Sequence, residues 1–318
     1  MKIIKKLKLG KFVYNYFYAP SLNFRYHITH FGVVGWYKYK IGEKEMKTKA
    51  KSLKINIKHN HKESITINFL TGKNYWHQTI FGIYSFIKSH NNNVKVNIFS
   101  DGTIDEETKG IFLNFCAEIE ILDEKEVVRR LNVILPKERF PTLNYLRNWH
   151  PFFRRLIDIH ILAEGWAVHL DSDMLFFNYP TEFLSKANKK ESFYMFEKLE
   201  ESFFVDTPKN LLEIHKIGVK EKVNGGVIAY NSSLVDYQDL EQKASLLLNE
   251  YKDTVPAKVE QTLMSYILYQ QNAIPLNSEE YHIFYDKEIS QKSKPSLCHY
   301  IFKAKAPYFT SEWKKIIN

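Results

Sequence analysis

The chain has 318 residues, of which 44% are hydrophobic and 25% are charged, and this composition excludes an intrinsically disordered protein. Residues 1–62 contain 15 basic and 2 acidic side chains, a net charge of +13. Because the whole chain has a net charge of +9, residues 63–318 carry −4. Because the main body is slightly acidic, no basic stripe for nucleic acid is predicted. The asymmetry predicts a separate surface partner for a basic N-terminal extension, residues 1–62.

Three features bear on the compartment. Cys116 and Cys298 are too few cysteines for a disulfide framework, so a reducing cytoplasm is expected. No stretch approaches 18 consecutive apolar residues, so no transmembrane helix is predicted. The first 20 residues are basic but lack an apolar core and a small-residue cleavage site, which is not the pattern of a signal peptide. We therefore expect a cytoplasmic protein.

The extension is also rich in aromatic residues between positions 12 and 39. They include Tyr14, Tyr16, Phe17, Tyr18, Phe24, Tyr26, Trp36 and Tyr37. Aromatic rings beside lysines suit the headgroup region of an anionic membrane, which would give peripheral contact at its inner face. Packing on the main domain as an accessory layer explains the same rings, and the sequence leaves both alternatives open.

From residue 64 onward, predicted strands and helices alternate. Strands are expected at residues 65–70, 94–99, 118–122, 167–170, 193–196, after Gly226 and at 273–276. Helices are expected at residues 75–90, 105–116, 125–131, 143–162 with a break near Pro151, 240–251 and 259–269. This order predicts an α/β domain over residues 63–318 with a mixed, mainly parallel sheet flanked by helices. In such sheets, ligands bind beyond the carboxyl ends of the strands.

The most informative motif is Asp171-Ser172-Asp173, which directly follows the apolar run at residues 167–170. Carboxylates rarely lie beside a buried strand unless a partner neutralises them. Alternate residues of an extended segment share a face, so two hard oxygen ligands would project from one edge. That arrangement suits Mg²⁺ or Mn²⁺ held together with substrate phosphates. A polar strand end in which Asp171 caps a turn is the alternative.

Together these segments resemble nucleotide-sugar-dependent glycosyltransferases of the GT-A fold. The closest resemblance is to the family 8 retaining enzymes, which include glycogenin and bacterial lipo-oligosaccharide galactosyltransferases. It covers roughly residues 64–310 and rests on several motifs in order. It implies a Rossmann-like GT-A domain that transfers a hexose with retention, with UDP-hexose favoured as the donor. The acceptor would be a glycan, a lipid-linked glycan or another hydroxyl compound.

The resemblance assigns the nucleoside and donor contacts. Thr71-Gly72-Lys73-Asn74-Tyr75 lies where the first strand of that family meets the nucleoside, which implies Thr71 and Tyr75. Phe153-Arg154-Arg155-Leu156 resembles an Ala-Arg-Leu element whose arginine contacts the donor. Arg155 is the better match and Arg154 is the fallback.

The Asp-x-Asp motif and a glycine pair imply further contacts. Asp171 and Asp173 match the family's metal motif, and the motif as a whole, with Ser172, would also contact the nucleotide sugar. Asn224-Gly225-Gly226-Val227 is similar to an Asn-Ala-Gly-Val element that lines the sugar pocket. From the residues alone, the two glycines indicate a close backbone approach, either to a ligand or in a tight turn.

The remaining motifs lie near the C-terminus. Glu260-Gln261-Thr262 resembles Asp-Gln-Asp, whose glutamine lies under the anomeric carbon, although Thr262 replaces the second aspartate. His299 and Lys305 match a His-Phe-x-Gly-x-x-Lys element, in which the histidine is the third metal ligand and the lysine binds the diphosphate. Phe302 stands at the glycine of that element.

The implied chemistry is the expulsion of a nucleoside diphosphate from a sugar. A divalent cation, helped by Arg155 or Lys305, would neutralise the charge that develops on the leaving phosphate. The mixed oxygen and nitrogen ligands Asp171, Asp173 and His299 favour Mn²⁺ over Mg²⁺. Gln261 is an amide and a poor nucleophile, so it would stabilise an ion-pair intermediate while the leaving phosphate accepts the acceptor's proton. Acceptor contacts or a solvated turn would explain three later glutamates: Glu197, Glu200 and Glu201.

Two other classes of protein compete with this hypothesis. A phosphatase of the haloacid dehalogenase type also carries Asp-x-Asp after a strand. It requires Thr or Val four residues after the first aspartate, where this chain has Leu175, and it usually has the motif early in the chain. A nucleic-acid-binding protein would explain the basic, aromatic extension, but no recognised binding module is present.

Overall fold

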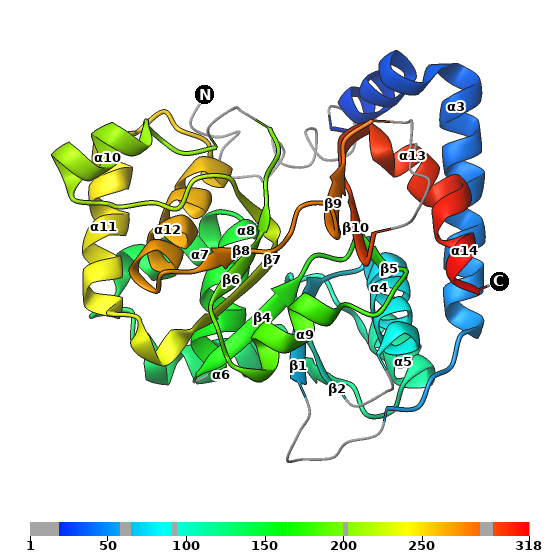
Figure 1. Cartoon of the computed structure of the whole chain (residues 1–318), viewed down its shortest axis with the longest axis horizontal. Helices are drawn as coiled ribbons and strands as arrows, with labels where there is room; N and C mark the ends of the chain where they lie inside the picture. The colour runs from blue at the N-terminus through cyan, green and yellow to red at the C-terminus, as the bar shows by residue number, and fades with distance from the viewer. Residues whose placement is uncertain are drawn as a thin grey trace, which may run out of the picture. The chain divides into compact units, whose positions relative to one another are not determined.

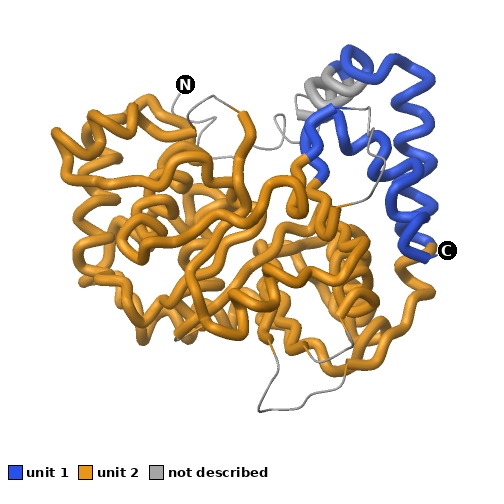
Figure 2. Tube along the Cα trace, viewed as in Figure 1, with its two compact units in different colours: residues 1–48, 284–290, 300–318 blue, residues 49–283, 291–299 orange. Residues whose placement is uncertain are grey.

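The computed structural model describes residues 19–57, 65–90, 94–163, 165–199, 203–286 and 295–317. The chain divides into two compact units, shown in different colours in Figure 2. We call residues 49–283 and 291–299 the sheet unit, and residues 1–48, 284–290 and 300–318 the terminal unit. The terminal unit therefore combines both ends of the chain. The sequence-based division into residues 1–62 and 63–318 follows a different boundary and stays a prediction.

The sheet unit is built on a seven-stranded sheet in the order β3-β2-β1-β4-β7-β6-β8 (Figure 1). The strands are β1 (Ile65–Thr71), β2 (Val94–Ser100), β3 (Glu120–Leu122), β4 (Trp166–Leu170), β6 (Phe193–Phe196), β7 (Val223–Asn231) and β8 (Ile274–Pro275). β1 to β4 run parallel, β7 is antiparallel to both β4 and β6, and β8 is parallel to β6. The predicted mixed, mainly parallel α/β sheet is thus confirmed.

Helices cover this sheet. They are α4 (Trp76–Ser89), α5 (Glu106–Phe115), α6 (Glu124–Ile134), α7 (Pro141–Trp149), α8 (Phe152–Arg154), the π-helix η2 (Arg155–Ile161), α9 (Thr181–Asn188), α10 (Pro208–His215), η3 (Ser232–Leu234), α11 (Tyr237–Glu250) and α12 (Pro256–Gln270). Asp105 caps α5 by accepting from the backbone N–H of Thr108 at 2.9 Å, as predicted. The predicted break near Pro151 is also confirmed, because α7 ends at Trp149 and α8 begins after the proline.

One hydrophobic core lies between the sheet and the helices α6, α7, η2, α11 and α12. It contains fully buried residues of both layers, among them Phe153, Leu156, Ile228, Val259 and Leu263. The apolar spacing of these helices, read from the sequence, buries one face of each against the strands. The core includes Phe99 near the end of β2, and Leu70 near the end of β1 packs against it.

A second, three-stranded sheet has the order β5-β10-β9, with β5 at Met174–Phe176, β9 at Tyr281–Phe284 and β10 at Leu297–Tyr300. β5 and β10 are antiparallel, and His299 lies opposite Met174. β5 begins directly after the Asp-x-Asp motif. This pairing therefore brings a residue from near the C-terminus to the metal motif.

The terminal unit contains most of the long helix α3 (Ala19–Ser52), up to Thr48, and the short C-terminal segments η4 (Phe302–Ala304), α13 (Lys305–Pro307), η5 (Tyr308–Glu312) and α14 (Lys314–Ile317). α3 bends at Gly32, whose φ of 68° lies in the left-handed region. Within this unit α3 packs on the C-terminal segments: the rings of Tyr39 and Phe309 are 4.8 Å apart, and Lys314 pairs with Glu45 at 2.6 Å. Across the described residues, no helix combines the length and apolarity needed to cross a bilayer.

Candidate active site

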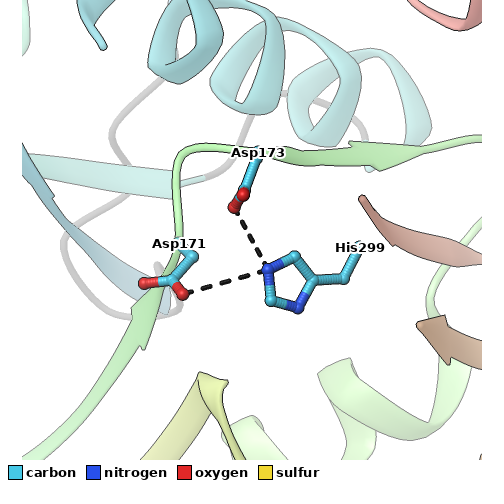
Figure 3. A group of neighbouring side chains, drawn as sticks. All are labelled: Asp171, Asp173 and His299. Carbon is cyan, nitrogen blue, oxygen red and sulfur yellow. Dashed lines mark hydrogen bonds and ion pairs between the residues drawn. The ribbon is translucent and has the colours of Figure 1, made fainter. Parts of the chain in front are cut away.

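Asp171, Asp173 and His299 gather at the carboxyl end of β4 (Figure 3). His299 Nε2 lies 3.1 Å from Asp173 Oδ1 and 3.9 Å from Asp171 Oδ2. One ligand atom of each residue lies within 4.8 Å of those of the other two. The histidine is almost fully buried, whereas both aspartates are partly exposed. Two carboxylates and an imidazole that converge from two strands form a donor set that a divalent cation can use.

Gly226 supports the ring of His299. A Cβ atom at this position would lie 2.5 Å from His299 Cε1 and 2.7 Å from its Nδ1, so only glycine fits. The Gly226 carbonyl also accepts a hydrogen bond from the Asp171 N–H at 2.8 Å. One glycine thus contacts residues of both sides of the metal cluster. Of the two sequence interpretations of the glycine pair, Gly226 makes a close approach, and its neighbour is the histidine ring.

The strand that carries the glycines differs from the prediction. A strand was expected only after Gly226, but β7 begins at Val223. Its pairing with β6 shifts register, because Tyr194 pairs with Ile228 and Met195 with Asn224, so residues 225–227 have no partners on β6. The glycine pair indicated a turn before the strand. The strand nevertheless continues through this segment, because its other edge pairs with β4, where Val227 lies opposite Leu170. The shift leaves the glycine backbone facing the Asp-x-Asp turn.

Asn224 fixes this register shift. Its Oδ1 accepts from the Gly226 N–H at 2.9 Å, and its Nδ2 donates to Glu197 Oε2 at 2.9 Å. Glu197 is only 4% exposed and also accepts from the Leu199 N–H. The solvated-turn interpretation of Glu197 is therefore wrong, because its carboxylate is committed to buried donors. Glu200 and Glu201 lie outside the described residues.

Arg155 lies beside the metal cluster. Its Nη1 is 3.4 Å from both carboxylate oxygens of Asp171 and 3.3 Å from the Gly225 carbonyl, and its Nη2 is 3.1 Å from Glu260 Oε2. Burial lowers the pKa of Arg155, but Glu260 and Asp171 outweigh that effect and hold it above its usual value. Burial raises the pKa of Glu260. With Asp173, the cluster contains three carboxyl groups and one guanidinium, a formal charge of −2 that a divalent cation would neutralise.

Arg154 points elsewhere, although it is adjacent in the sequence. Its guanidinium pairs with Glu124 and donates to the Ser100 carbonyl at 3.3 Å. The arginine that contacts Asp171 is Arg155, in agreement with the better of the two sequence matches. Glu260, which holds Arg155 from the other side, was assigned no separate role from the sequence. Its signal was an acidic residue next to Gln261 at a predicted helix start.

The predicted nucleoside residues lie on the neighbouring strand end. Thr71 is buried, and a chain of hydroxyl groups joins it through Thr79 to Ser172, each step being 2.8 Å. Tyr75 keeps 51% of its surface exposed. Burial raises the pKa of Tyr75, and the carboxylates of Asp101 and Asp173 add to the effect. Ser172 is therefore tied to the body of the domain, and the Tyr75 ring remains open to solvent.

The last two predicted residues differ in their placement. Gln261 is 8% exposed, and its Nε2 donates to the Val223 carbonyl at 2.6 Å, next to Asn224. Lys305 belongs to the terminal unit, where its Nζ lies 5.5 Å from the centre of the Tyr308 ring. Its predicted contact with a diphosphate stays a prediction. Phe302 has a φ of 46°, a left-handed conformation, at the position where the resembled motif has glycine.

Two buried histidines that the sequence analysis missed lie behind the site. His169 donates from Nε2 to the Gly225 carbonyl at 2.7 Å, and its Nδ1 is 3.0 Å from His160 Nε2. Since a carbonyl can only accept, Nε2 is the protonated nitrogen of His169. Burial lowers the pKa of His169 to about 4 and the pKa of His160 well below its usual value, so both are neutral at pH 7. The sequence signal that could have indicated His169 is its position two residues before Asp171, in the alternation His169, Asp171, Asp173.

No protein-family model and no curated protein matches the sequence. Among solved structures, the apo structure of the bifunctional glycosyltransferase WbbM has a TM-score of 0.51 and 13% identity over 83% of this chain and 51% of that one. The chain thus spans about half the length of WbbM. The galactosyltransferase LgtC, in complex with donor and acceptor sugar analogues, has a TM-score of 0.44 and 14% identity over 74% of this chain and 87% of that one. The glycosyltransferase GlyE of Streptococcus pneumoniae has a TM-score of 0.45 and 14% identity over 80% of this chain and 62% of that one.

These structures are glycosyltransferases, and the likeness to WbbM concerns the fold. Together with the sheet order and the flanking helices, it shows that the chain has the GT-A fold that the sequence predicted. Fold alone does not establish an activity, because one fold hosts many reactions. The activity has to be argued from the residues at the site.

Proposed function

We propose that this protein is a metal-dependent glycosyltransferase that moves a sugar from a nucleotide-sugar donor to a hydroxyl acceptor. The observation that carries the proposal is the convergence of Asp171, Asp173 and His299 at the carboxyl end of β4 in a GT-A fold. This is the edge at which parallel α/β sheets bind ligands. No observation on the described part of the chain favours the phosphatase or the nucleic-acid-binding alternative.

The three residues would hold Mn²⁺, with Mg²⁺ as the second choice, because the set mixes carboxylate and imidazole ligands. When bound, the cation supplies neutralisation of the charge that grows on the leaving diphosphate. The chain itself keeps the ligands in place: Gly226 supports the His299 ring and fixes the Asp171 backbone. Preorganised ligands reorganise little when the substrate arrives.

Arg155 would orient the donor. Glu260 and Asp171 hold its guanidinium from two sides, and its Nε is a buried atom without a hydrogen-bond partner. Buried polar atoms are nearly always hydrogen-bonded, so the unpartnered Nε supports a role in which a ligand oxygen completes the cluster. Asn224, Gly225 and Gly226 would line the sugar pocket, and the two glycines have no partners on β6.

Gln261 would lie under the anomeric carbon and support transfer with retention. Its amide is held by the Val223 carbonyl, at the start of the segment proposed to line the sugar pocket. The exposed Tyr75 ring would contact the base of a nucleotide such as UDP, with Thr71 and Ser172 shaping the pocket through their hydroxyl chain. Lys305 would bind the diphosphate.

On the acceptor side, Phe152 presents an apolar ring that is 41% exposed and lies 5.3 Å from the Arg155 guanidinium. An exposed aromatic ring beside a transfer site offers the apolar face of a sugar a surface on which to pack. This favours a glycan or a lipid-linked glycan as the acceptor. Peripheral membrane contact through residues 1–62 suits a lipid-linked acceptor and is part of the proposal.

The test is metal-dependent binding of the donor. Calorimetry with UDP-, GDP- and CMP-sugars should give tight binding of one nucleotide class with Mn²⁺, and the binding should be lost in excess EDTA. Asp173→Asn should lose it even with Mn²⁺ present, since an amide is a poor metal ligand. Asp236→Asn is the matched control, because Asp236 only caps α11 and should leave the affinity unchanged. Unchanged nucleotide affinity in excess EDTA would refute the proposal.

A further inference from the structure

Charge is divided unevenly between the two units, as it is along the sequence. The terminal unit contains 15 basic and 5 acidic side chains, a net charge of +10, whereas the sheet unit, which contains the candidate active site, carries −1. The unit that joins the two ends of the chain therefore holds the entire excess of positive charge. A charge of this size concentrated in one small unit attracts anionic partners over several ångströms.

The described part of α3 carries an exposed apolar stripe. Val33, Tyr37 and Ile41 recur every fourth residue, which places them along one face of the helix, and they are 67%, 62% and 40% exposed. Val34, also 67% exposed, lies beside them. We call these four residues the α3 stripe.

The stripe faces away from the packed side of its own unit. The opposite face of α3 is the one that contacts the C-terminal segments, because a Cβ at Gly42 would lie 2.2 Å from the Phe309 carbonyl oxygen and Met46 is fully buried. The bend at Gly32 begins a new helical segment directly before the stripe. Within this unit α3 therefore uses one face for folding and leaves the other apolar and open to solvent.

Lysines border the stripe. Lys38 and Lys44 are exposed and make no ion pair with any residue that the structure describes, and Lys40 pairs with Glu43 at 3.0 Å. Uncompensated lysines around apolar side chains are the combination that binds an anionic bilayer: the apolar groups enter the interface and each nearby lysine adds about 1 kcal/mol.

Other partners fit less well. Association of two copies through this stripe would bring two units of net charge +10 together, which like-charge repulsion opposes. A nucleic acid would pair with the lysines but would leave Val33, Val34 and Ile41 exposed, because aliphatic side chains offer no stacking surface. We infer that the α3 stripe and its bordering lysines are a docking face for an anionic lipid bilayer. This deepens the proposed function by naming the surface at which a lipid-linked acceptor would be met.

The test is sedimentation of the full chain with vesicles. It should bind vesicles of equal parts phosphatidylglycerol and phosphatidylcholine, fail to bind pure phosphatidylcholine, and be released as salt screens the charges. Tyr37→Asp should weaken binding roughly tenfold or more, because it removes an inserted ring and adds a repelled charge. Val133→Asp is the matched control, since Val133 is 78% exposed on α6 of the sheet unit.

A second variant, Lys38→Gln with Lys44→Gln, keeps good helix formers and should reduce binding and its salt dependence. All variants lie at exposed positions and should keep the circular dichroism spectrum of the parent. The inference is overturned if the full chain ignores anionic vesicles at low salt, or if Val133→Asp lowers binding as much as Tyr37→Asp. Dimers that form without lipid and disappear in Tyr37→Asp would assign the stripe to a second copy instead.

Vesicle binding and donor binding are separate measurements. Because the vesicle assay needs no nucleotide sugar, retained vesicle binding without nucleotide binding would contradict the proposed function and leave this inference intact. Nucleotide binding without vesicle binding would do the reverse.

Discussion

Two clusters of charged side chains contain the adjacent residues Arg154 and Arg155, one in each cluster, and they are built differently. In the first, Arg147 binds Asp158 through two hydrogen bonds of 2.6 and 2.9 Å, and Glu124 bridges Arg147 and Arg154. In the second, Arg155 reaches Asp171 only at 3.4 Å and Glu260 at 3.1 Å. We call them the Asp158 cluster and the Arg155 cluster.

The difference lies in what each cluster leaves unbonded. Both carboxylate oxygens of Asp158 accept from Arg147. In the Arg155 cluster, Arg155 Nε and Glu260 Oε1 are buried without a hydrogen-bond partner. Buried charges that satisfy one another stabilise the fold, whereas a buried cluster with unsatisfied atoms at the end of a strand is prepared for a ligand. Of two adjacent arginines, Arg154 therefore belongs to the satisfied cluster, and Arg155 is the one that we propose for the site.

The largest effect is expected from breaking the Asp158 cluster. Asp158→Ala should lower the free energy of unfolding by about 3–5 kcal/mol, because it leaves the buried Arg147 without its main counter-charge. Urea denaturation measures this loss. Glu126→Ala, which removes exposed pairs with Arg129 and Arg130, is the control and should cost far less stability. Equal losses for the two variants would contradict the distinction between the clusters.

The two arginines can be compared directly by the same substitution. Arg155→Lys should reduce turnover by about 10²–10³-fold with little change in stability, since a lysine cannot span Asp171 and Glu260. Arg154→Lys should instead lower the melting temperature and leave the turnover of the folded protein nearly unchanged. Steady-state kinetics and thermal unfolding of both variants check this. If Arg154→Lys lost more turnover than Arg155→Lys, the assignment would be reversed.

A pair of glycine variants tests whether the metal side of the Arg155 cluster is shaped around His299. Gly226→Ala should weaken Mn²⁺ binding roughly 10–100-fold, because its Cβ would displace the imidazole ring. Gly110→Ala, in the exposed middle of α5 with no atom within 4 Å of the new Cβ, should keep Mn²⁺ affinity and add about 0.5–1 kcal/mol of stability. Titration with Mn²⁺ separates the two, and equal affinities would show that the glycine does not support the ligand.

The smallest expected effect is on the pH dependence of stability. Burial holds the pKa values of His160 and His169 below 6.5, so the unfolded chain binds more protons and stability should fall as pH drops from about 6.5 toward 4. Asp158, whose pKa burial raises from 3.8 to about 6, acts in the opposite direction across that window. His160→Gln should therefore make the acid loss shallower, as measured by unfolding between pH 7 and 5. An unchanged slope would mean that His160 does not titrate on unfolding.

Much of the sheet unit was predictable from the sequence. Its strands alternate or run apolar, its helices have regular apolar spacing, and Asp105 is a local capping signal, so each element is encoded within a few residues. The meeting of Asp171 and Asp173 with His299, 126 residues after Asp173, was predicted only through the resemblance, because no local pattern specifies the pairing of β5 with β10.

What was missed depends on contacts distant in the sequence. The register shift at Gly225 and Gly226 is held by Asn224 on β7 and by Glu197, which follows β6. The partnership of Glu260 with Arg155 joins residues 105 positions apart. The helix α3 was not predicted, since its basic and aromatic composition indicated a partner more strongly than a structure. The periodicity of apolar residues predicts which face of a helix or strand is buried. It does not predict which charged side chains will contact one another.

In the π-helix η2, the number of residues in the turn matters as well as their identity. A π-helix closes hydrogen bonds from i to i+5, one residue more per bond than an α-helix, and η2 begins at Arg155 and includes Asp158. Deleting one residue here would let the turn close as an α-helix and would change the angle between the Arg155 and Asp158 side chains about the helix axis. Arg155 and Asp158 would then no longer face their separate clusters. In an alignment of related chains, a one-residue gap within this turn would be as informative as the loss of either side chain.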